Sequence, residues 1–198
     1  MRTIRISIGL SMLVFCLALI AACQGQSPAP AAPAAPAEPT YLPTATIKDL
    51  MLSIVDPSAD VVWLSVTTVA SEKGLVETRP TTDAEWARVR QGAVTLAEAA
   101  NLLMIPGRHV ARPHEKSETP GVELEPAEME ELIKKDPAAF YRHAKALYDA
   151  AMLAVEAIDK KDADRVFEVG ENIDQACEQC HRSYWYPNEK IPELPVSK

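Results

Sequence analysis

Cys177, Cys180 and His181 are the residues with the clearest chemical potential, and together they form a C-x-x-C-H pattern near the C-terminus. Residues spaced i, i+3 and i+4 share one face of a helix, so the two thiols and the imidazole project from the same side. Two thiols at this spacing can each form a thioether with one vinyl group of a single porphyrin, and the adjacent imidazole can bind its iron. The pattern therefore predicts one covalently attached haem c, with His181 as an iron ligand.

Other kinds of site use the same cysteine spacing. A C-x-x-C pair can be a redox-active dithiol or half of a structural zinc site. A redox dithiol usually opens a helix after a strand, and no strand is expected before residue 177. A zinc site needs a further ligand nearby, and residues 182–198 contain neither Cys nor His. A structural disulfide between Cys177 and Cys180 is the third alternative.

The N-terminal residues have the composition of an export signal. Arg2 and Arg5 precede an apolar stretch, residues 6–22, that is short for a bilayer-spanning helix. The end of this stretch and the following Cys23 read LIAAC, which resembles the lipobox of bacterial lipoproteins. Residues 1–23 are therefore predicted to be a signal peptide with Cys23 lipidated. The alternative is an ordinary signal peptide in which Cys23 has no role.

The mature chain is expected to be exported to the periplasm and anchored there to a bacterial membrane by its lipid. Loss of Arg2 and Arg5 leaves 18 basic residues against 28 acidic ones, so the formal net charge falls from −8 to −10. An acidic chain argues against a nucleic-acid partner and against electrostatic binding to anionic lipid. It is compatible with a basic redox partner protein.

Composition divides the rest of the chain into a tether, a domain and a tail. Residues 24–43 are rich in Pro and Ala, cannot bury a core, and are predicted to form an extended tether. From residue 44 onward apolar residues recur at helical spacing, with no sustained alternation and no two-residue hairpin turn. We therefore expect an all-α domain over residues 44–190. The tail, residues 191–198, is expected to lie against its surface.

Four amphipathic helices are expected in this domain, and their natural packing is an antiparallel four-helix bundle with one haem near the C-terminal helix. Asp56-Pro57 predicts a kink or a boundary within the first helix, since Asp favours a helix cap and Pro the first turn. A long polar connection, residues 107–135, is expected to pass over one end of the domain and to include a short helix. The predicted helices cover about residues 46–70, 82–104, 136–158 and 162–184.

A signal followed by four helices with C-x-x-C-H on the last resembles the class II c-type cytochromes, the cytochrome c′-like four-helix bundles. The likeness extends over roughly residues 46–186, and the strings at residues 49–63, 80–86 and 180–185 are similar to a proteobacterial branch of that family. The resemblance implies that Cys177 and Cys180 attach the haem and that His181 is the proximal iron ligand. It also allows a homodimer.

In these cytochromes the residue that faces the iron from the other side comes from the first helix, where this chain has Met51. A coordinating Met51 would give a six-coordinate, low-spin iron suited to electron transfer. A Met51 that is only a core side chain would leave a five-coordinate iron able to bind NO or CO. Tyr184, three residues after His181, is expected to contact the haem.

These patterns together predict a membrane-tethered monohaem c-type cytochrome that transfers single electrons. A five-coordinate, gas-binding haem protein is the alternative. The chain contains no G-x-S-x-G sequence, no glycine-rich phosphate loop and no H-E-x-x-H sequence, so no enzymatic activity is expected.

Overall fold

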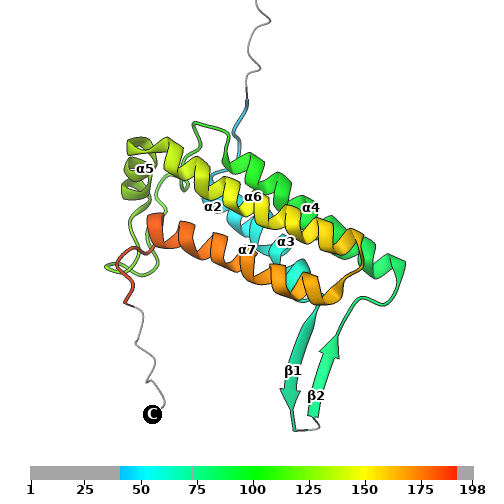
Figure 1. The fold of residues 1–198 in the computed structure, drawn as a ribbon. Coiled ribbons are helices and arrows are strands. Elements are labelled where there is room, and N and C mark those ends of the chain that lie inside the picture. Colours follow the sequence, from blue (N-terminus) through cyan, green and yellow to red (C-terminus); the bar gives the residue numbers. More distant parts are fainter. Residues whose placement is uncertain (1–40, 73, 191–198) are drawn as a thin grey trace, which may run out of the picture. The chain divides into compact units, whose positions relative to one another are not determined.

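The computed structural model describes residues 41–72 and 74–190, over which the chain is mostly helical (Figure 1). The predicted signal peptide, the lipidation site at Cys23, residues 24–40 of the tether and the tail at residues 191–198 lie outside the described residues.

The first helical segment consists of α2 (Ile47–Leu50), η1 (Met51–Val55) and α3 (Asp56–Trp63), where η1 is a π-helical turn. Its start is fixed by a reciprocal cap. The Thr46 hydroxyl accepts a hydrogen bond from the backbone N–H of Asp49 at 3.0 Å, and the Asp49 carboxylate accepts one from the N–H of Thr46 at 3.1 Å.

The π-helical turn lies immediately before the predicted irregularity at Asp56-Pro57. The N–H of Asp56 donates to the carbonyl of Met51, five residues earlier. Pro57 has no N–H to donate, and its ring would meet the carbonyl of Ser53 in a regular α-helix, so a wider turn relieves that contact. The irregularity is confirmed, but the cap is wrong: Asp56 has helical dihedral angles and does not cap a new helix.

The prediction of an all-α domain is also wrong in one segment. Helix α3 ends at Trp63 rather than near residue 70, and β1 (Thr67–Ser71) pairs with β2 (Gly74–Thr78) in an antiparallel hairpin. β-Branched Thr and Val residues favour the extended chain, and Gly74 takes a φ of +109° that suits glycine. The hairpin extends away from the helices (Figure 1), and every residue of β2 is exposed. Without a buried face, the strands carry no alternation of apolar and polar residues.

The later helices agree with the predicted ones. Their first turns are capped by the side chains of Thr82, Asp136 and Asp162, each of which accepts a backbone N–H three residues ahead. These helices, together with a short one inside the long connection, are α4 (Asp83–Leu103), α5 (Pro126–Lys135), α6 (Pro137–Asp159) and α7 (Ala163–Tyr184).

Helix α4 packs against α6, α6 packs against α7, and α3 contacts both α4 and α7 (Figure 1). Two ion pairs join the start of α4 to the end of α6, which shows that these helices run in opposite directions. Lys161 lies 2.5 Å from Asp83, and Arg90 lies 2.7 Å from Asp159. The helices enclose one apolar core, whose largest fully buried side chains are Leu96, Ile173, Val62, Val166 and Val169.

Gly92 marks the closest approach of α3 and α4. A Cβ atom at this position would lie 2.6 Å from Cγ1 of Val61 and 3.2 Å from the carbonyl oxygen of Ser58. We predict that Gly92→Ala lowers the free energy of unfolding by about 1–3 kcal/mol, because overpacking outweighs the better helix propensity of Ala. Urea denaturation measures this change. The exposed neighbour provides the control, and Gln91→Ala should stay within about 0.5 kcal/mol of the parent; a stabilised Gly92→Ala variant would contradict the packing.

Candidate functional site

A cavity of about 480 Å³ lies where α4 and α7 end and α6 begins. This volume falls within the ~300–1,000 Å³ typical of small-molecule and cofactor sites. Most of its lining is apolar and comes from α3, η1 and the three long helices. The apolar side chains of this wall include Met51, Val55, Ala59, Leu103, Phe140, Ala144, Leu147 and Ala176.

Cys177, Cys180 and His181 all line this cavity from α7, as the sequence pattern predicted for a shared face. Burial raises the pKa of Cys177 to about 11 and that of Cys180 to about 12, so both side chains are protonated thiols at neutral pH. The two cysteines are free in the structure. Burial also lowers the pKa of His181, which leaves a neutral imidazole with a nitrogen lone pair available to a metal.

Two aromatic rings contact the imidazole of His181. The ring of Trp185 meets it edge-on with centroids 5.1 Å apart, and the ring of Tyr186 lies 5.8 Å away. The backbone N–H groups of Trp185 and Tyr186 both donate to the His181 carbonyl, at 2.7 and 3.0 Å. The chain after α7 therefore folds back against the histidine, an arrangement that sequence reasoning missed.

Met51 lines the same cavity from the π-helical turn η1, on a different helical segment from the cysteines. Another methionine, Met129 of α5, lines it as well. Two histidines of the long connection, His109 and His114, are exposed and lie outside the lining. Met51 thus lines the same cavity as Cys177, Cys180 and His181, and Met129 adds a second thioether to the lining.

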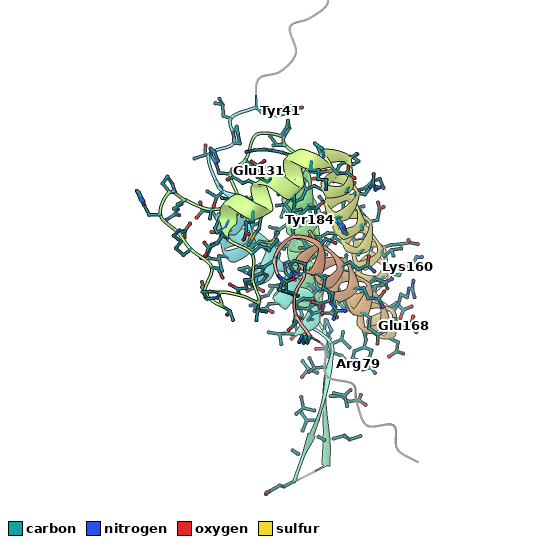
Figure 2. All side chains as sticks on the ribbon, turned by 90° about the vertical axis from the view of Figure 1, so that its left-hand side faces the viewer. Tyr41, Arg79, Glu131, Lys160, Glu168 and Tyr184 are labelled. Atoms are coloured by element: carbon teal, nitrogen blue, oxygen red, sulfur yellow. The ribbon has the colours of Figure 1, made fainter. Side chains whose placement is uncertain are left out.

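Tyr184 also lines the cavity, at the end of the molecule that faces the viewer in Figure 2. Its ring makes edge contacts with Phe140, at 5.5 Å between centroids, and with His143, at 5.7 Å. His143 is a further lining residue. The sequence indicates this position through the spacing of His143 from Phe140 and Leu147, because all three share one face of α6.

The long connection forms part of the cavity wall, through residues such as Val110, Ala111 and Ser117. Its backbone is tied to α2, because the N–H groups of Ile47 and Lys48 donate to carbonyls of the connection at 2.9 Å each. It is also tied to the end of α7 by a 2.8 Å hydrogen bond from the Leu124 N–H to the Trp185 carbonyl. The connection therefore lies against the start of α2 and the end of α7.

The charged part of the lining consists of Lys48, Asp56, Lys116, Glu118 and Glu123. Lys48 lies 3.3 Å from Glu118. Burial would raise the pKa of Glu123, but donated hydrogen bonds, from the backbone of Thr119 and the side chain of Ser117 among others, lower it overall. The carboxylate of Glu123 therefore stays ionised and holds the connection in a tight turn.

Within residues 41–72 and 74–190 no group of three or more His, Cys, Asp or Glu side chains could hold a metal ion. In the same part of the chain, no helix is both long enough and apolar enough to cross a membrane.

No protein-family model matches the chain, and no curated protein and no solved structure was found to be similar to it. The resemblance to class II c-type cytochromes therefore depends on the sequence strings given above and on the residues gathered at the cavity.

The buried neutral His181 predicts a pH dependence of the protein's stability. The pKa of His181 is lower in the folded protein than in the unfolded chain. Between this lowered pKa and about pH 6.5, the unfolded chain therefore binds one more proton than the folded protein. The free energy of unfolding should therefore fall as the pH drops below about 6.5, and urea denaturation between about pH 5.5 and pH 8 measures it. His181→Gln should reduce this slope. The exposed control, His114→Gln, should keep it, and an unchanged slope in His181→Gln would contradict the assignment.

Proposed function

We propose that the chain is a monohaem c-type cytochrome whose helices α3, α4, α6 and α7 form an antiparallel four-helix bundle around the haem site. The observation that supports this most is that one apolar cavity gathers Cys177, Cys180, His181 and Met51. A porphyrin is a large apolar disc with carboxylates at one edge, and the lining is apolar with Lys48 and Lys116 among its charged members. The residues present therefore fit the group.

Attachment would need no oxidant or reductant. Each thiol would add across one vinyl group, so that sulfur bonds to one vinyl carbon and the thiol hydrogen moves to the other. Cys177 and Cys180 are the donors of these sulfurs. Lys48 and Lys116 would pair with the porphyrin carboxylates through charge-assisted hydrogen bonds.

The haem supplies an iron that cycles between the ferrous and ferric states. His181 would bind it through a neutral imidazole nitrogen. If the thioether of Met51 also bound the iron, it would favour the ferrous state and so raise the reduction potential. Because electron transfer needs no acid, base or nucleophile from the chain, these residues act by binding and orientation alone.

The acidic chain suits a redox partner with a basic surface. A lipid on Cys23 would hold the domain at the periplasmic side of a bacterial membrane, with residues 24–43 as the tether. A homodimer is compatible with this arrangement.

The first test is haem attachment. Protein exported from a host that matures c-type cytochromes should be red, give a pyridine haemochrome spectrum of the c type, and carry the mass of one haem. The double variant Cys177→Ala/Cys180→Ala should be colourless. Cys23→Ala, which removes a cysteine elsewhere, should keep the haem and lose membrane association. A colourless parent protein whose mass is lower by two hydrogens would show a disulfide instead.

The second test is iron coordination by Met51. Met51→Ala should lose the low-spin ferric spectrum and bind carbon monoxide rapidly in the ferrous state, because the sixth ligand is gone. Met129→Ala, which shortens the other methionine of the cavity lining, should keep both properties of the parent protein. A parent that already binds carbon monoxide rapidly, with Met51→Ala unchanged, would favour the gas-binding alternative.

A further inference from the structure

We propose that Tyr186, held by Glu178, is a positioning residue for the axial imidazole of His181, and that these two side chains tune the potential of the iron. The inference rests on the proposed haem site. Tyr186 lies outside the C-x-x-C-H pattern, and Glu178 occupies one of its two variable positions.

Glu178 lies between the two cysteines and has both carboxylate oxygens engaged. Nε of Arg182 donates to one oxygen at 2.5 Å, and the hydroxyl of Tyr186 donates to the other at 2.6 Å. These two side-chain hydrogen bonds lower the pKa of Glu178, with the Tyr186 bond the larger cause, and burial opposes them. Glu178 is therefore a fixed negative charge one helical turn from His181.

A Glu–Arg pair at i,i+4 is common on helix surfaces and by itself implies nothing about a site. The Tyr186 hydroxyl is the additional feature, because Tyr186 follows the end of α7 and has to fold back to reach Glu178. Tyr186 is held at two points. Its backbone N–H donates to the His181 carbonyl at 3.0 Å, and its hydroxyl reaches Glu178.

Between these two points the ring of Tyr186 contacts the imidazole of His181, with centroids 5.8 Å apart and planes inclined by 60°. The ring cannot swing away unless the bond to Glu178 breaks. Partners outside the metal ligands commonly fix the orientation of a ligating histidine, and here an anchored aromatic ring takes that role. Together with the nearer ring of Trp185, the anchored ring of Tyr186 would therefore fix the orientation of the imidazole plane.

The charge of Glu178 acts on the iron in a second way. A carboxylate near the axial ligand stabilises the more positive ferric state, and so lowers the reduction potential. Arg182 offsets part of this effect because it shares the same carboxylate. The hydroxyl of Tyr186 thus helps to fix the orientation of the His181 imidazole, while the carboxylate of Glu178 places a negative charge near the iron.

Two variants of the haem-loaded protein separate these roles. Tyr186→Phe removes one oxygen and should change the g-values of the ferric electron paramagnetic resonance spectrum, because the imidazole plane is no longer fixed. Glu178→Gln keeps an acceptor for the Tyr186 hydroxyl but removes the charge, and should raise the midpoint potential. Melting temperatures and haem content are measured for each variant, because a merely structural role would change these and not the spectrum.

Matched controls are available in the same chain. Tyr141→Phe removes a hydroxyl from an exposed tyrosine of α6, and Glu171→Gln removes a carboxylate seven residues before Glu178 on α7, about 10 Å along the helix. Both controls should match the parent protein in g-values and potential.

Parent-like g-values in Tyr186→Phe together with a parent-like potential in Glu178→Gln would overturn the inference while leaving the haem site intact. A parent protein without covalent haem would overturn the proposed function, and the inference with it. Haem content of the parent, measured first, distinguishes these two failures.

Discussion

The candidate site depends on an apolar cavity of about 480 Å³ that the helices leave at one end of the domain. Away from the cavity the helices pack closely. Ala93, Ala151 and Ala154 have no exposed surface. Val61 packs so close to Gly92 that a Cβ atom there would lie only 2.6 Å from its Cγ1 atom.

Pro57 influences which side chains line the cavity. Because Pro57 cannot take part in a regular helical ladder, the preceding turn widens into η1. Residues on either side of such a turn are rotated relative to their positions in an uninterrupted α-helix. Both Met51, which begins the turn, and Val55, which ends it, line the cavity. A local backbone constraint thus helps to determine which side chains of the first helical segment face the site.

Sequence reasoning succeeded where a signal is local. Thr82, Asp136 and Asp162 mark the starts of α4, α6 and α7, because an N-cap side chain acts on its own helix. Two features of the structure have no such signal in the sequence. The exposed hairpin formed by β1 and β2 has no alternation to detect, and no local pattern places Tyr186 against His181. The shared face of Cys177, Cys180 and His181 was predictable because helical spacing alone determines it.

The burial of the two thiols has a consequence for the order of events in the proposed cytochrome. With pKa values of about 11 and 12, Cys177 and Cys180 are almost entirely protonated at neutral pH once the domain has folded, and thiols react mainly as thiolates. The folded domain would therefore be a poor substrate for attachment. Thioether formation should precede the packing of α7 against α6 and α3, when both cysteines are exposed and have ordinary pKa values. An apolar group already bonded to α7 would then occupy the cavity as the helices close around it.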